Sequence, residues 1–96
     1  MTLDEFRRSL DEAAPPAGLA PAVLALWWQG KGDWQAAHRH AQAAGDPAGD
    51  WVHAHLHRVE GDLDNAGYWY RRAGQPVADG PLDAEWAAIS EALLAR

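Results

Sequence analysis

Residues 32–47 read GDWQAAHRHAQAAGDP, and residues 61–76 read GDLDNAGYWYRRAGQP. The two segments match at a constant offset of 29 residues, in the Gly-Asp pair that begins each, in alanines along each, and in the proline that ends each. Upstream, Ala25 corresponds to Ala54 at the same offset. A repeat of this length is typical of stacked helical hairpins, in which each hairpin buries the apolar face of its neighbour.

The length and composition indicate one globular domain. The chain has 96 residues, of which 48% are hydrophobic, and it has no cysteine for a disulfide or a thiolate metal site. No apolar run approaches the ~20 residues that span a bilayer. The first residues are acidic, where a secretory signal would be basic and then apolar. We therefore expect a cytoplasmic protein.

The distribution of charge disfavours two classes of partner. The formal net charge is −6, and the excess of acidic residues lies in the two flanks, residues 1–14 and 77–96. No cluster of Lys and Arg offers the cations that neutralise phosphates, so a nucleic-acid partner is not expected. The same reasoning disfavours an anionic membrane surface.

Cap and break signals predict six helices and no strand. A capping box, Thr2-x-x-Glu5, begins a helix that is expected to run to about Ala14. Gly and Pro breaks then predict helices at about residues 19–30, 33–44, 46–60 or 50–60, and 62–73, with a last helix from residue 83. The alternative starts of the fourth helix reflect two possible caps, Asp46 and Asp50, and Asp83 is expected to cap the last helix.

These elements predict an all-α fold of two antiparallel helical hairpins with flanking N- and C-terminal capping helices. The chain divides into a capping helix and linker (1–18), a first hairpin (19–47), a second hairpin (48–76), and a loop with the C-terminal helix (77–96).

Each hairpin resembles a tetratricopeptide or Sel1-like repeat. The resemblance rests on a small residue in the first helix, Gly-Asp and a bulky residue at the turn, small residues along the second helix, and a final proline. It implies that Trp34 in one copy and Leu63 in the other plug the bend. The 29-residue period is shorter than the usual 34, and two copies are fewer than the usual three or more. Residues 51–58 and 68–74 also resemble segments of small bacterial proteins without an assigned function.

The resemblance places Trp51, His55 and Arg58 on the concave side that receives ligands in tetratricopeptide hairpins. Trp and Arg are enriched at binding hot spots, so this face is a candidate partner-binding surface. Arg58 is also placed to stack on Trp51 as a cation–π pair. Packing of Trp51 in the core is an equally good interpretation.

Trp69 and Arg72 form a second candidate surface. They lie in an aromatic and basic run, Tyr68 to Arg72, in which Tyr70 matches an inward position. Trp69 and Arg72 are therefore candidates for an outer, partner-binding face. Arg72 has an alternative role, because a cation near the end of a helix complements its dipole. Trp86 is expected to anchor the last helix.

The histidines suggest metal chemistry, but their spacing restricts it. His53, His55 and His57 alternate, and positions two apart on a helix point roughly 200° apart, so only His53 and His57 share a face. They supply two ligands where zinc needs three or four, and His38 or His40 would have to complete the set. Packed or hydrogen-bonded histidines are the favoured interpretation, with no metal or cofactor, and a metal site at His53 and His57 is the alternative.

The function expected from the sequence is protein–protein interaction, with a peptide or protein partner or a second copy of the chain bound through a Trp, His and Arg surface. No phosphate-binding loop, nucleophile elbow or zinc-protease helix is present, so an enzyme is not expected. Two alternatives stay open: a metal- or pH-responsive protein that uses its histidines, and a small-molecule pocket or an enzyme of unknown reaction.

Overall fold

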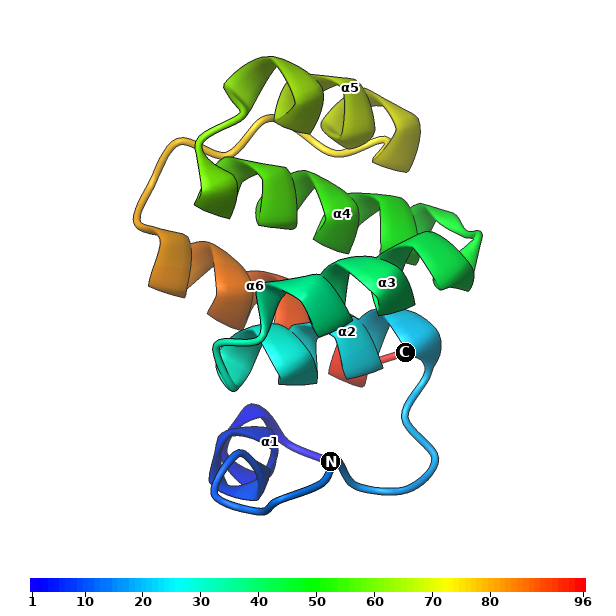
Figure 1. The fold of residues 1–96 in the computed structure, drawn as a ribbon, viewed down its shortest axis with the longest axis vertical. Helices are drawn as coiled ribbons and strands as arrows, with labels where there is room; N and C mark the ends of the chain where they lie inside the picture. Colours follow the sequence, from blue (N-terminus) through cyan, green and yellow to red (C-terminus); the bar gives the residue numbers. More distant parts are fainter.

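The computed structural model describes all 96 residues, and it contains six helices and no strand. The helices are α1 (Leu3–Ser9), α2 (Pro21–Gly30), α3 (Trp34–Ala44), α4 (Pro47–Glu60), α5 (Leu63–Ala73) and α6 (Leu82–Leu94). Figure 1 shows α5 at one end of the molecule and α1 at the other, with α2, α3, α4 and α6 between them. The all-helical prediction is confirmed.

The second helix of each repeated segment begins and ends in the same way. The side chains of Asp33 and Asp62 accept hydrogen bonds from backbone N–H groups three residues later, and so cap α3 and α5. Gly45 and Gly74 end these helices in the left-handed conformation, with φ of 64° and 70°. Glycine adopts this conformation without the Cβ clash that other residues meet. The local chemistry of the repeated segments therefore produces matching helix ends.

The first residues of α4 and α6 decide two sequence-based predictions. Asp46 caps α4, because its Oδ1 accepts a hydrogen bond from the backbone N–H of Gly49 at 2.7 Å. The prediction that Asp83 caps the last helix is wrong. Pro81 is the N-cap residue of α6, and no side chain makes the capping hydrogen bond. Asp83 instead lies in the first turn of α6, where its negative charge complements the helix dipole.

The first helix is shorter than predicted and ends at Ser9 rather than near Ala14. The ammonium group of Lys31 donates to the backbone carbonyls of Leu10 at 2.7 Å and of Glu12 at 3.0 Å. The backbone N–H groups of Asp11 and Glu12 donate to the carbonyls of Arg8 and Ser9, three residues earlier, so the chain leaves the α-helical pattern after Ser9. The Lys31 contact ties the segment after α1 to the turn between α2 and α3.

The core lies where α2, α4 and α6 meet. α2 packs against α3, α4 packs against α5, and α3 packs against α4, while α6 lies against both α2 and α4 (Figure 1). The largest fully buried apolar side chains in the main core are Phe6, Leu26, Trp27, Val52, Leu56 and Ile89. α4 is therefore the helix around which the others are arranged.

Two tryptophans join the flanking helices to this core. The Nε1 of Trp27 donates to the hydroxyl of Ser9 at 3.1 Å, which links α2 to α1. The ring of Trp86 stacks on Phe6 with 5.7 Å between centroids, and its Nε1 donates to the carbonyl of Leu26 at 2.9 Å. The prediction that Trp86 anchors the last helix is confirmed.

The two bends of the hairpins are not filled alike. Trp34 is partly buried and its Nε1 donates to the carbonyl of Leu56 at 2.8 Å, so it bridges α3 to α4. Leu63, the corresponding residue of the second copy, is 67% exposed. The prediction that Leu63 plugs the second bend is wrong, because α5 packs chiefly on α4 and no further hairpin follows it.

A glycine sets how closely α3 and α4 approach. A Cβ atom added at Gly49 would lie 2.5 Å from the Cβ of Ala44 and 2.9 Å from the carbonyl oxygen of Ala41. Both are far shorter than van der Waals contact, and one of them involves backbone. Only glycine fits here without moving the helices apart.

We expect Gly49→Ala to lower the free energy of unfolding by about 1–3 kcal/mol, because the methyl group overpacks the contact between α3 and α4. Gly67→Ala is the matched control inside α5. A Cβ there would meet only the guanidinium of Arg71 at 3.6 Å, an ordinary contact. This second change is expected to raise stability by about 0.5–1 kcal/mol, since alanine favours a helix more than glycine does. Chemical denaturation of the two variants makes the comparison, and equal effects of the same sign would refute the close approach.

Candidate functional site

The three alternating histidines of α4 face two different sides of the helix. His53, His55 and His57 are all buried, with 3%, 1% and 7% of their surface exposed. His53 and His57 lie next to His38 of α3. His55 instead lies next to Glu85 of α6. The prediction that His53 and His57 share a face without His55 is confirmed.

His38 completes a cluster of three histidines, which we call the His38 cluster: His38, His53 and His57. The Nε2 atoms of His38 and His53 are 3.0 Å apart. One ring nitrogen from each of the three lies within 4.8 Å of the others. Residues 38 and 40 were both candidates from the sequence, and only His38 belongs to the cluster. The packing of α3 on α4 therefore joins a residue of the first hairpin to two of the second.

A carboxylate and an amide hold the ring of His57. The Nδ1 of His57 lies 2.6 Å from Oε1 of Glu60, one turn further along α4. The amide Nδ2 of Asn65 lies 3.3 Å from the Nε2 of His57. A carboxylate accepts and an amide nitrogen donates, so the ring proton sits on Nδ1 and Nε2 carries a lone pair. Nε2 is therefore the nitrogen that His57 can offer to a metal ion, and it would give up the hydrogen bond from Asn65 to do so.

Two tryptophans cover the rings of the cluster. Trp34 stacks on His38 with 4.8 Å between centroids and 13° between planes. Trp69 stacks on His53 with 3.9 Å between centroids and 24° between planes. The cluster thus lies between two indole rings, one from α3 and one from α5.

Burial keeps two of these histidines neutral. Burial, together with the nearby rings of His38 and His57, lowers the pKa of His53 to about 4. Burial also lowers the pKa of His38, and His57 adds to this effect. At neutral pH both rings therefore carry no charge, and a neutral ring has one nitrogen lone pair.

A second polar site lies on the opposite side of α4, around Glu85 of α6. The Oε1 of Glu85 lies 2.6 Å from the Nδ1 of His55 and 3.0 Å from the Nη1 of Arg58. The hydroxyl of Tyr70 donates to Oε2. Three side chains of α4 and α5 therefore converge on one buried carboxylate of α6. We call this set the Glu85 network.

Two opposing effects act on the pKa of Glu85. Burial favours the neutral acid, but the hydrogen bonds from His55, Tyr70 and Arg58 outweigh it and hold the pKa of Glu85 below its ordinary value. Burial and the hydrogen bond to Glu85 raise the pKa of Tyr70, so its hydroxyl stays protonated and donates. Glu85 is therefore an ionised carboxylate, and the Nδ1 of His55 carries the proton that faces it.

The Glu85 network changes the interpretation of the predicted concave surface. Arg58 does not stack on Trp51. Its guanidinium donates to Glu85 and to the carbonyl of Gly80, so it is held against α6 and the loop before it. His55 is buried beneath α6, and Trp51 is partly buried against the core. The C-terminal part of the chain itself covers this face of the second hairpin, contrary to the open surface expected from the resemblance.

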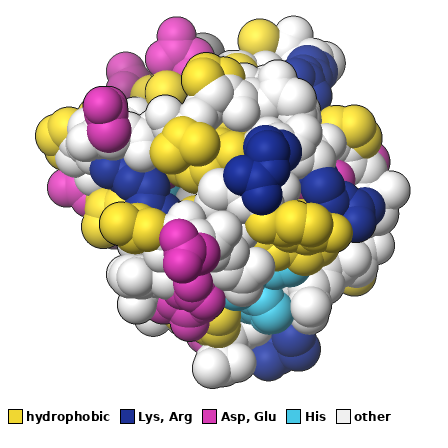
Figure 2. Space-filling model, turned by 90° about the horizontal axis from the view of Figure 1, so that it is seen from above, with side chains coloured by type: hydrophobic (Ala, Val, Ile, Leu, Met, Phe, Trp, Pro, Cys, Tyr) yellow, Lys and Arg dark blue, Asp and Glu magenta, His cyan; other side chains and the backbone are white.

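Trp69 and Arg72 lie on the other side of the molecule. Trp69 is partly buried on His53, and the guanidinium of Arg72 lies 5.1 Å above its ring. Arg72 is 53% exposed and lies 3.7 Å from Asp50. Figure 2 views the molecule from the α5 side and shows histidine atoms at the surface beside hydrophobic side chains, with Lys and Arg side chains close by. The binding of a partner by Trp69 and Arg72 stays a prediction.

Sequence reasoning missed Glu85, although a signal was present. Glu85, Ile89 and Leu93 are spaced four apart, so they share one face of α6, and the last two are buried apolar residues. A carboxylate on the apolar face of a helix must have partners inside the protein. That argument identifies Glu85 as a buried group, but it does not identify His55, Arg58 and Tyr70 as its partners.

Comparisons with models of protein families, with curated proteins and with solved structures found no match for the chain. None of the helices combines the length and the apolar character that crossing a membrane requires. The function must therefore be argued from the two polar sites themselves.

The Glu85 network is expected to make stability depend on pH in the acid range. The folded-state pKa of Glu85 lies below its unfolded value, so the network stabilises the fold above about pH 4.3 and this contribution is lost as the pH falls further. Glu85→Gln is expected to lower the free energy of unfolding by about 2 kcal/mol at pH 7. It is also expected to weaken the dependence of that free energy on pH in the acid range. Urea denaturation at a series of pH values measures both effects.

Glu91→Gln is the matched control, because Glu91 is an exposed residue of the same helix. The stability of this variant is expected to depend on pH in the same way as that of the parent protein. Profiles of the parent and of Glu85→Gln that run parallel down to acid pH would contradict an ionised, hydrogen-bonded Glu85.

Proposed function

We propose that this protein is a short tetratricopeptide-like repeat protein that binds a divalent transition-metal ion between its two hairpins. His38, His53 and His57 are the proposed ligands. The observation that carries the proposal is the placement of one ring nitrogen from each within 4.8 Å of the other two.

The spacing of these nitrogens is close to what a metal ion requires. Two nitrogens bound at 2.0–2.1 Å to one tetrahedral zinc ion lie about 3.3 Å apart. The Nε2 atoms of His38 and His53 are 3.0 Å apart, so an ion needs only a small separation of the two rings. Without an ion, these two nitrogens share one proton in a hydrogen bond. For an ion to bind, the ring that donates would carry its proton on Nδ1 instead of Nε2, so that both Nε2 atoms offer a lone pair to the metal.

The donor set selects a class of metal. Three imidazole nitrogens suit zinc, copper and nickel, whereas magnesium and calcium prefer oxygen ligands. Three ligands also leave a fourth tetrahedral position for water or another ligand. We therefore propose Zn²⁺, Cu²⁺ and Ni²⁺ as the ions that the site accepts.

The groups around the cluster support the same role. Glu60 accepts the Nδ1 proton of His57, the arrangement that orients a histidine and makes its other nitrogen a better ligand. Trp34 and Trp69 stack on the rings of His38 and His53 and limit their rotation. Burial keeps His53 neutral, as a ligand must be.

The three proposed ligands come from both hairpins, so the metal site forms only when the hairpins pack together. The first repeated segment supplies His38, and the helix before the second supplies His53 and His57. At the offset of 29, His38 corresponds to Gly67, while His53 and His57 correspond to Leu24 and Trp28, so the period does not produce another such cluster. Only the stacking of the two hairpins brings the three ligands together. Metal binding is therefore expected to stabilise the stacked arrangement.

A metal-dependent rise in melting temperature tests this proposal. At zinc concentrations about a hundredfold above Kd, binding contributes about 2.7 kcal/mol, which corresponds to a rise of roughly 11–22 °C for a domain of this size. His53→Leu and His38→Leu are expected to abolish the rise while keeping the sites filled with apolar atoms. Cu²⁺ is also expected to quench the fluorescence of Trp34 and Trp69, which touch the ligand rings.

His40→Leu is the matched control. His40 belongs to the same helix as His38 but lies outside the cluster, so the metal-dependent rise should persist in this variant. Melting curves of the parent protein that do not move with zinc, copper or nickel would refute the proposed function. Equal loss of the rise in His40→Leu would show that the ion binds elsewhere.

A further inference from the structure

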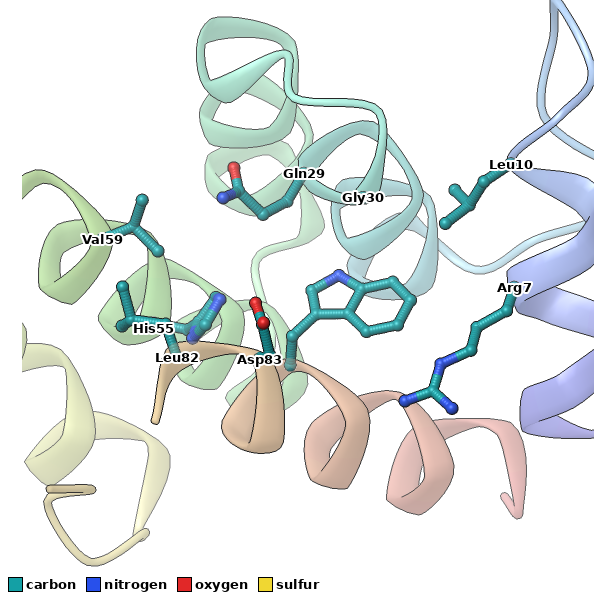
Figure 3. A pocket seen from close by; sticks show the side chains of 9 residues that line it. Arg7, Leu10, Gln29, Gly30, His55, Val59, Leu82 and Asp83 are labelled. Carbon is teal, nitrogen blue, oxygen red and sulfur yellow. The ribbon is translucent and has the colours of Figure 1, made fainter. Parts of the chain in front are cut away.

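The stack of helices is covered at one end and open at the other. At the covered end, Leu10, just after α1, lies against Gly30 of α2 (Figure 3). At the open end, α5 packs chiefly on α4, and its outer face, on which Asp64, Tyr68 and Arg71 are exposed, points away from the rest of the molecule (Figure 1). The last unit of a repeat stack needs a covering for the face that a next unit would bury. The chain itself supplies no such covering for the outer face of α5.

Apolar and aromatic side chains are exposed at this open end. At the offset of 29 residues, Leu63 of α5 corresponds to Trp34 of α3, which bridges to the next hairpin. No further hairpin follows α5, and Leu63 stays exposed. Tyr68 is 45% exposed, and Val77, which lines the same hollow as Leu63, is 63% exposed. Exposed apolar side chains that gather at one place indicate contact with another molecule.

Opposite charges lie at the two ends of the outer face of α5. Asp64 and Arg71 are about two helical turns apart, so they project from the same side of the helix, with Tyr68 between them. Neither forms an ion pair within the chain, whereas Arg72 is paired with Asp50. Figure 2 looks onto this end and shows hydrophobic side chains near the middle, with most acidic side chains to the left and most Lys and Arg side chains to the right. A face with this pattern is complementary to the same face turned by half a revolution.

We propose that the outer face of α5 binds the same face of a second copy of this chain, with the two helices antiparallel and related by a two-fold axis. In that arrangement Asp64 of each copy meets Arg71 of the other, so the same ion pair forms twice. The axis passes between residues 67 and 68, which brings the two exposed Tyr68 rings into the middle of the contact. A parallel arrangement would place Asp64 against Asp64 and Arg71 against Arg71. Repulsion between like charges therefore selects the antiparallel dimer.

The size of this face predicts a weak dimer. α5 has 11 residues, which corresponds to a length of about 16 Å. A contact of this length buries less than the roughly 1,600 Å² of a standard stable interface. We expect a Kd of about 100 µM, which is typical of a transient contact. The monomer therefore predominates at low micromolar concentrations, and the dimer forms when the protein is concentrated.

Sedimentation equilibrium from about 20 µM to about 1 mM protein tests this inference. The buffer contains EDTA, so association through a bound metal ion is excluded and the result does not depend on the proposed metal site. We expect the parent protein to change from monomer to dimer over this range. Asp64→Arg and Arg71→Asp are each expected to weaken self-association at least about tenfold, because each places like charges together twice. Asp64→Arg also lowers the net negative charge, so general repulsion between copies predicts the opposite result for this variant.

An equimolar mixture of these two variants tests the pairing itself. Each copy of Asp64→Arg then offers two cations to the two carboxylates of Arg71→Asp, so a heterodimer should form although neither variant associates alone. Asp4→Arg is the matched control, because it makes the same change of charge at an exposed residue in the first turn of α1, at the other end of the molecule (Figure 1). It should associate as the parent does. A parent protein that stays monomeric to about 1 mM, single variants that associate like the parent, or a mixture that does not associate would each overturn the inference.

Discussion

Four helices pack around α4, so its polar side chains must find partners inside the protein. Seven of its residues are buried, and three of these are histidines. A buried polar group without a partner costs several kcal/mol, a large fraction of the stability of a small domain. The helices packed around α4 supply these partners.

The two sides of α4 meet this requirement in different ways. On one side, His55 and Arg58 bind Glu85, and this charged network holds α6 over the second hairpin. Hydrogen bonds outweigh the cost of burying the carboxylate, as the lowered pKa of Glu85 indicates. On the other side, His53 and His57 meet His38, and Glu60 accepts the Nδ1 proton of His57. The lowered pKa values of His38 and His53 keep these two rings neutral, as metal ligands must be.

Much of the fold follows from local signals in the sequence, and the rest depends on contacts between distant segments. The caps Asp33 and Asp62 and the glycines after α3 and α5 act within one turn, so the repeated segments predict them. The helical period places His53 and His57 on one face. The choice between His38 and His40 depends on how α3 is rotated against α4, which no local signal determines.

The packing of α6 over the second hairpin could not be predicted from local sequence signals either. It depends on Glu85 reaching His55, a residue 30 positions earlier. The resemblance to tetratricopeptide hairpins implied an open concave face, and the first and second copies do differ there. His55 and Arg58, two of the residues that differ in the second copy, bind the last helix of the same chain.

X-ray absorption spectroscopy of the zinc-loaded protein tests the central claim most directly, because it reports the atoms bound to the metal. The expected spectrum shows nitrogen ligands at about 2.0–2.1 Å, with the outer-shell scattering of three imidazole rings. The same spectrum of His53→Leu should lose one imidazole ring. A first shell of oxygen atoms alone, or of one imidazole ring in the parent protein, would contradict a metal site at His38, His53 and His57.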